Sequence, residues 1–155
     1  MQISDRLLLS GGALTGVASL LHLAIILGGP DWYRFFGAGE DMARFAARGF
    51  VYPTIITAGI AVILGIWTLY ALSGARIIRR LPFLRLALPL IAVVYLARGI
   101  LGVPLVLFVE SPYASELRAK MTFMVVSSVI CVFLGLCYAA GAASVWKRHS
   151  ARRAS

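Results

Sequence analysis

Three polar side chains in this sequence lie within or beside long apolar segments, so their presence there needs a structural or functional explanation. His22 lies in the apolar stretch of residues 7–27, Arg98 in the stretch of residues 86–108, and Glu40 in the polar segment after the first stretch. An imidazole exchanges a proton near neutral pH, and a guanidinium binds a carboxylate or phosphate through two parallel hydrogen bonds. These residue types therefore fit the binding of an anionic or carbonyl-bearing ligand, or proton transfer.

Long apolar helices are expected to carry these side chains. With 61% hydrophobic and 14% charged residues and a mean hydropathy of +0.90, the chain has too little polar surface to cover a soluble globule. About 20 apolar residues in a helix cross a bilayer core of roughly 30 Å. Four stretches meet this length: 7–27, 51–73, 86–108 and 121–144. We predict an all-α membrane protein, a bundle of four transmembrane helices in one domain (1–146) with a basic cytoplasmic tail (147–155).

The first stretch is predicted to be a retained span, because it is long, runs into Gly-Gly-Pro and precedes three more spans. Positive charge gives the orientation. Nine basic residues lie near the chain ends and between the second and third spans, against five, balanced by acids, in the other two loops. The positive-inside rule then places both termini in the cytoplasm, in a cell inner membrane. The same placement accounts for the net charge of +9, because basic residues next to spans interact with membrane lipids. Nucleic acid is therefore not a predicted partner.

Small and aromatic residues predict how the helices pack. Four-residue spacing of small side chains allows close helix approach, and it occurs at Ser127, Cys131, Gly135 and Ala139, and again at Gly12 and Gly16. We expect these two seams to pack inside the bundle, with a homo-oligomer as the alternative. Cys131 and Cys137 lie on separate faces of one helix and are predicted to be unpaired core residues. An aromatic belt is expected on the inner side at Trp67, Tyr70, Tyr138 and Trp146.

Arg98 is the most informative residue, because a charged side chain within a span is costly and usually faces the bundle interior or water. It is predicted in the outer half of the third span. One interpretation is structural: Arg98 extends toward the outer surface or bonds carbonyls freed by Pro104. The other is that it binds a ligand or a carboxylate. His22, in the same outer half, is either an interhelical hydrogen-bonding residue or a proton carrier. No metal or haem site is predicted, because the only other histidine is His149 in the tail.

The segment PDWYRFFGAGEDM (residues 30–42) forms the first outer loop and is predicted to contain a short interfacial helix. Gly37 and Gly39 permit backbone bends, and a second short helix is expected from Glu40 to Arg48. Glu40 either pairs with Arg44 four residues on or serves as the carboxylate partner of Arg98. In the second case His22, Glu40 and Arg98 close an outer-half pocket, and the predicted ligand-binding set is Arg98, His22, Glu40, Trp32 and Tyr33.

The fourth helix is predicted to begin before its span. Ser111 can cap it and Pro112 suits its first turn, while Glu116 and Lys120 are spaced to form an ion pair.

The stretches HLAIILGGPDWYRFFGAGE and YLARGILGVP resemble those of a group of small bacterial inner-membrane proteins with no assigned activity, over about residues 20–104. The broader pattern of four helices with polar residues near the outer ends is similar to the DoxX-like and EXPERA-like membrane proteins. That resemblance implies a compact four-helix bundle, with roles from respiratory-chain accessory subunits to sterol isomerases and amphiphile binders. The paired acids within the helices of the isomerases are missing here, so the resemblance implies the fold and no catalytic residue.

The function expected from these observations is binding of a small amphiphile, a lipid or a quinone, in the outer-half pocket, or an accessory-subunit role. A small-solute or ion transporter is a second hypothesis. Its weakness is that the predicted spans contain no acidic residue, so a path across the membrane would have no visible polar lining. A membrane isomerase or oxidoreductase is a third, but the sequence has no recognisable nucleophile, metal cluster or nucleotide loop. A scaffold in a larger complex is the fourth. No cofactor and no catalytic residue are assigned.

Overall fold

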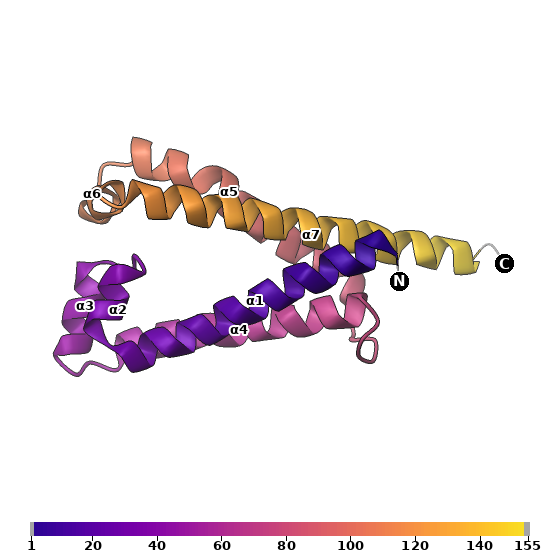
Figure 1. Cartoon of the computed structure of the whole chain (residues 1–155), viewed down its shortest axis with the longest axis horizontal. Helices are drawn as coiled ribbons and strands as arrows, with labels where there is room; N and C mark the ends of the chain where they lie inside the picture. Colours follow the sequence, from indigo (N-terminus) through magenta and orange to yellow (C-terminus); the bar gives the residue numbers. More distant parts are fainter. Residues whose placement is uncertain (1, 154–155) are drawn as a thin grey trace.

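The computed structural model describes residues 2–153, in which every regular element is a helix (Figure 1). Four helices are long and apolar enough to cross a membrane: α1 (Ile3–Gly28), α4 (Tyr52–Gly74), α5 (Leu84–Phe108) and α7 (Met121–Arg153). Three short helices lie between them: α2 (Pro30–Phe35), α3 (Glu40–Ala47) and α6 (Pro112–Arg118). The predicted all-α class with four spans is confirmed, and the chain is a multi-pass membrane protein.

The last helix differs from its prediction at its beginning. Ser111 does cap a helix, since its Oγ accepts a hydrogen bond from the Ala114 N–H at 3.1 Å, but that helix is α6 and it ends at Arg118 before α7 begins. At its other end, α7 continues beyond the predicted span, through the basic tail, as far as Arg153. Residues 1, 154 and 155, and the side chains of residues 149 and 151–153, lie outside the described part of the chain.

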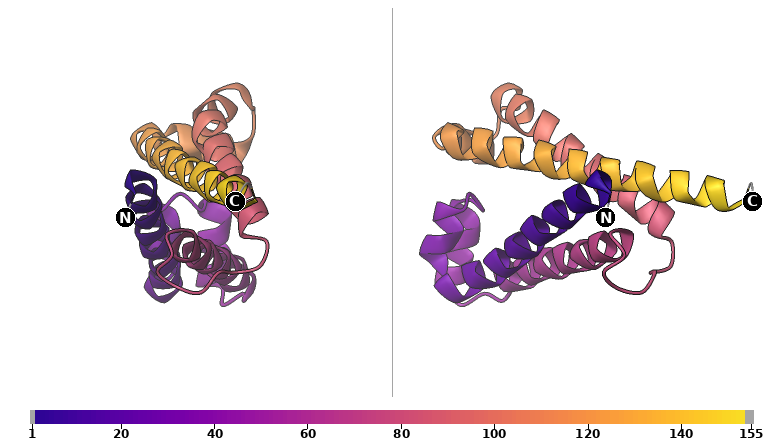
Figure 2. Two further views of the ribbon diagram at one scale, coloured as in Figure 1. Left: turned by 90° about the vertical axis from the view of Figure 1, so that its right-hand side faces the viewer. Right: turned by 45° about the vertical axis from the view of Figure 1, so that its right-hand side comes forward.

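The four long helices form two antiparallel pairs, α1 with α4 and α5 with α7 (Figure 1). The pairs meet near the two chain termini, mainly through α1 and α7, and diverge toward the short helices, as two views show (Figures 1 and 2). We call the end that holds the termini and the α4–α5 loop the terminal end. The end that holds α2, α3 and α6 is the distal end.

The small-residue seams pack inside the bundle, as predicted. A Cβ on Gly12 would lie 2.6 Å from the Ala71 Cβ of α4, and one on Gly135 would lie 2.6 Å from the Leu96 Cγ of α5. Each glycine therefore lets its helix pack against the partner within the same pair. Cys131 and Cys137 are free, also as predicted.

The pairs are joined in the middle of the bundle by a buried polar cluster. The hydroxyls of Tyr95 and Tyr138 each hydrogen-bond to Thr15 Oγ1, at 3.1 and 3.3 Å, and Tyr138 also donates to the Trp67 carbonyl at 3.1 Å. Tyr138 is fully buried, so its predicted place in the aromatic belt is wrong. A tyrosine suits this position because its ring fills the core and its hydroxyl finds acceptors on two other helices.

A second link lies at the terminal end, around Asp5, an acid for which we predicted no role. Asp5 is 1% exposed and pairs with Arg76 at 3.0 Å and with Arg148 at 2.8 Å. Arg148 also donates to the Gly74 carbonyl at 3.1 Å. A buried carboxylate needs such partners to offset its lost hydration. Asp5 thereby joins α1, the α4–α5 loop and α7.

Candidate ligand site at the distal end

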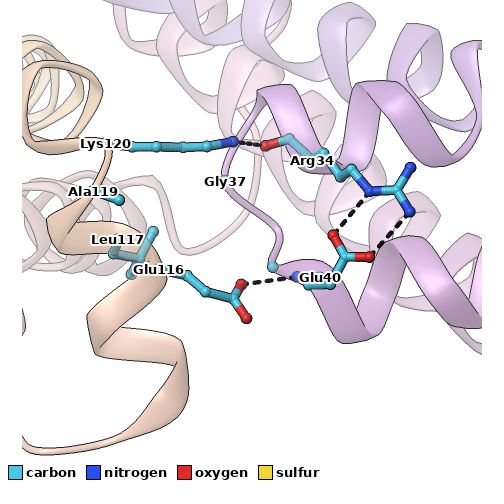
Figure 3. A pocket seen from close by; sticks show the side chains of 8 residues that line it. Arg34, Gly37, Glu40, Glu116, Leu117, Ala119 and Lys120 are labelled. Atoms are coloured by element: carbon cyan, nitrogen blue, oxygen red, sulfur yellow. Dashed lines mark hydrogen bonds and ion pairs between the residues drawn. The ribbon is translucent and has the colours of Figure 1, made fainter.

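The loop between α2 and α3 folds back on itself, which decides the partner of Glu40. Gly37 and Gly39 have φ of 74° and 96°, in the left-handed region that glycine adopts without steric cost. The turn brings Arg34 to Glu40, with its Nε 2.8 Å from Oε2 and its Nη2 3.0 Å from Oε1 (Figure 3). The predicted pairing of Glu40 with Arg98 is not formed. Arg44, the other predicted partner, lies at 3.9 Å from the carboxylate.

This two-bond ion pair sets the charge of both residues. The hydrogen bonds from Arg34 hold the pKa of Glu40 below its ordinary value of 4.5. In return, the Glu40 carboxylate raises the pKa of Arg34 further above its usual range. Asp31 adds a third bond to the guanidinium, at 2.9 Å. Glu40 is therefore a fixed anion at neutral pH and is poorly suited to serve as a proton donor.

The same loop also bridges the two helix pairs. Tyr113 donates its hydroxyl proton to the Gly37 carbonyl at 3.0 Å. The Glu116 carboxylate accepts the Glu40 N–H at 2.8 Å, and Lys120 Nζ donates to the Arg34 carbonyl (Figure 3). We call these three hydrogen bonds the distal contact. They correct the predicted Glu116–Lys120 ion pair, because each of the two side chains turns instead to the α2–α3 loop. The diverging pairs are thus reconnected at their far end.

A pocket of about 440 Å³ lies at the distal contact. Its walls come from both helix pairs: Arg34, Gly37, Gly39 and Glu40 on one side, and Glu116, Leu117, Ala119 and Lys120 on the other (Figure 3). Of the residues predicted to bind a ligand, only Glu40 lines it. Its charged groups already bond to protein partners, so few of them are free to bind a ligand.

Arg98 lies deeper, on α5. Its side chain is exposed, and within residues 2–153 it forms no hydrogen bond or ion pair. Its charge nevertheless acts on a neighbouring group outside the span, the Tyr113 hydroxyl. Burial raises the pKa of Tyr113, and the Arg98 charge opposes that rise. Because Tyr113 belongs to the distal contact, Arg98 lies within electrostatic range of that contact, and no acid in the described part of the chain forms an ion pair with it.

His22 faces the second helix pair from α1. It is seven residues beyond Thr15 and therefore on the same helix face, the face that meets Tyr95 and Tyr138 nearer the terminal end. Its Nδ1 lies 2.7 Å from the Ala18 carbonyl oxygen. A carbonyl only accepts, so Nδ1 carries the proton and Nε2 is the nitrogen left for another partner. No interhelical hydrogen bond of His22 occurs in the described structure.

The two aromatic residues of the predicted set pack against α1 instead of lining the pocket. The Trp32 ring lies over Gly28, where a Cβ would collide with it, and stacks at a tilt against Phe36 with centroids 5.7 Å apart. Tyr33 is 2% exposed in a cluster with Ile25 and Ala43, and its hydroxyl has no partner among the described residues. They fix the position of α2 on α1.

Sequence reasoning missed Arg34, Glu116 and Ser128, the last of which has a buried Oγ without a partner. Arg34 had a usable signal, namely two glycines between a cation and an acid six residues apart. Glu116 lies 76 residues from its partner Glu40, and such a pairing leaves no trace in one sequence.

Fold and site together define a four-span helical membrane protein with a polar site between two helix pairs at one end. Comparison of the chain with models of protein families, with curated proteins and with solved structures finds no match. The resemblance to DoxX-like and EXPERA-like proteins stays a prediction.

Proposed function

We propose that the protein binds a small amphiphile, a lipid or a quinone, in the distal half of the membrane, and acts there as a binding protein or accessory subunit. The observation that carries this proposal is Arg98, an exposed guanidinium in a span with no acceptor among the described residues. A charge in that position is costly unless it is paired. A bound amphiphile with an anionic or carbonyl head supplies the missing acceptor, and its apolar part stays in the bilayer.

The orientation belongs to the same proposal. Nine basic residues lie toward the terminal end, so we place that end in the cytoplasm of a cell with an inner membrane and the distal end on the outer side. The pocket at the distal contact then opens to the outer surface, above Arg98. An amphiphile head would approach from that surface or from the outer leaflet.

The proposal is tested by thermal unfolding of the purified protein in detergent, with a phospholipid, a fatty acid or a quinone added in turn. At least one of them is expected to raise the melting temperature of the wild type and not that of Arg98→Ala. Arg48→Ala is the matched control, because Arg48 is an exposed arginine on the distal loop outside the spans. The proposal fails if every amphiphile stabilises Arg98→Ala as much as wild type.

A further inference from the structure

Arg98 has a second polar group beside it, on α7. The Arg98 guanidinium folds over Gly102, where the missing Cβ leaves room for it. The Ser128 Oγ reaches the same place and lies 3.0 Å from the position that a Gly102 Cβ would occupy. Ser128 is only 5% exposed, and its Oγ has no hydrogen-bond partner in the described structure. Burying a hydroxyl without a partner is unfavourable, so this oxygen needs a hydrogen-bond partner that the described residues do not supply.

The groups around this point are hydrogen-bond donors with no acid among them. Arg98 offers several N–H groups and Ser128 one O–H. Glu40 and Glu116, the acids of the distal contact, are bonded to Arg34 and to the Glu40 N–H. A ligand that satisfies this cluster must therefore bring acceptor oxygens and negative charge.

The depth of the cluster suits the head of a membrane lipid. Gly102 lies six residues before the end of α5 at Phe108, which is about 9 Å along a helix. The Arg98 Cα is one turn deeper, and its side chain reaches toward the distal surface, as long basic side chains in spans do. The cluster therefore lies near the boundary between the hydrocarbon core and the headgroups.

An apolar groove adjoins the cluster. It has a volume of about 500 Å³, lies between α5 and α7, and is lined by Ser128 together with valines 103, 125, 129 and 132 and Phe133. Several of these side chains are turned outward, with Val129 63% exposed. Ser128 thus belongs both to the donor cluster and to a groove that faces the bilayer. Lipid chains can reach this groove directly from the bilayer.

We infer that Arg98 and Ser128 bind the phosphate group of a phospholipid, with one acyl chain of that lipid in the α5–α7 groove. The inference rests on the proposed function and names its ligand. A guanidinium donates two parallel hydrogen bonds to the non-bridging phosphate oxygens, and the Ser128 hydroxyl adds a third. Gly102 serves as the space in which the guanidinium lies.

The test measures the melting temperature of the full chain in detergent against increasing dioleoylphosphatidylglycerol. Dioleoylglycerol, which has the same chains without phosphate, oleate and a quinone are the comparison ligands. The phospholipid is expected to stabilise the wild type at the lowest concentration, and dioleoylglycerol to give no saturable shift. Arg98→Ala and Gly102→Ala are expected to need at least tenfold more phospholipid, and Ser128→Ala severalfold more.

Ser128→Ala is the decisive variant, since it removes a hydroxyl that has no partner and leaves the lipid-free melting temperature unchanged or slightly raised. Equal phospholipid affinity of Ser128→Ala and wild type, or equal binding of dioleoylglycerol, oleate or the quinone, overturns the inference. Suppose that the inference is overturned but Arg98→Ala is no longer stabilised by dioleoylglycerol, oleate or the quinone. The proposed function then stands, and the phosphate site does not. If no amphiphile depends on Arg98, both fail.

Discussion

Glu40 shows how the contribution of one charged residue to the stability of the distal end depends on pH. Its pKa lies below the ordinary 4.5 because Arg34 hydrogen-bonds to the charged form. A carboxyl with a depressed pKa adds stability above its unfolded-state pKa, and that stability is lost as the pH falls through the folded-state pKa. The Arg34–Glu40 pair therefore stabilises the protein at neutral pH and stops doing so only below 4.5.

We expect the difference in melting temperature between wild type and Glu40→Gln to be constant near neutral pH and to shrink on acidification below 4.5. The glutamine variant lacks the titrating group, so other acids cancel in the comparison. Thermal unfolding in detergent over a pH series measures it. A difference that persists unchanged well below pH 4.5 would show that the ion pair is not the cause.

Asp5 is the second residue whose replacement has a calculable effect. Asp5→Ala leaves Arg76 and Arg148 without their shared acceptor, and it should lower the free energy of unfolding by about 1–3 kcal/mol. The larger cost of a fully buried unpaired charge does not apply, because the side chains of Arg76 and Arg148 are 61% and 27% exposed and can turn to water. Asp41→Ala is the control. Its side chain is 83% exposed in a pair with Arg44, and equal losses in the two variants would contradict the assigned role of Asp5.

At the scale of elements, α5 and α7 pack through glycines where a side chain has no room. A Cβ on Gly135 would lie 3.1 Å from the Leu96 backbone nitrogen as well as close to its side chain. Gly135→Ala should therefore cost about 1–3 kcal/mol through overpacking. Gly59→Ala, on the open face of α4 with nothing within 4 Å, should be neutral or gain up to ~1 kcal/mol in helix propensity. Unfolding of both variants in detergent makes the comparison, and a stabilised Gly135→Ala would refute the close packing.

The α3 helix begins with a cap from another element. Gly39 has no side chain to bond the first N–H groups of α3, and the Glu116 carboxylate of α6 does so at 2.8 Å. Loss of a helix cap costs about 1 kcal/mol. Glu116→Ala should therefore speed amide hydrogen exchange in α3 by roughly fivefold at that cost. Exposed Glu110 gives the control Glu110→Ala, and the same rate in both variants would mean that the distal contact does not hold α3.

For the whole molecule, the two helix pairs give each end a different character. The terminal end is held by Asp5 and the middle of the bundle by the buried Thr15 cluster, while the distal end is joined by the hydrogen bonds of the distal contact and opens toward Arg98. This asymmetry suits a protein that admits an amphiphile from one side of the membrane. The orientation of the bundle then decides from which side of the membrane the amphiphile enters.

We predict that the distal end faces outward. In a chain with Cys131→Ala and Cys137→Ala, a membrane-impermeant thiol reagent applied to intact cells should label Asp41→Cys on α3 and not Arg80→Cys in the α4–α5 loop. Both positions are exposed, so accessibility within the protein is matched. Labelling of position 80 alone would show that the orientation is the opposite of the predicted one and that the Arg98 site lies in the inner half of the membrane.

The number and approximate limits of the four spans follow from hydropathy alone, because the thickness of a bilayer translates directly into a length of apolar chain. The sequence also identified Arg98 as unusual and predicted the internal use of the Gly12 and Gly135 seams, since small residues at helical spacing report close approach locally. The places of Asp5, Tyr138 and Ser128 could not be predicted in this way. Their burial depends on how each helix is rotated against its neighbours.

The partners of the polar side chains became visible in the folded structure and not before. Glu40 meets Arg34 through a turn at two glycines, Glu116 caps α3 from 76 residues away, and Arg98 shares its place with Ser128 of another helix. Hydropathy and helical period fix which face of a helix is apolar, and they carry no information about which residues of two distant helices come into register. That register is set by side-chain packing across the bundle, so it is a property of the folded chain as a whole.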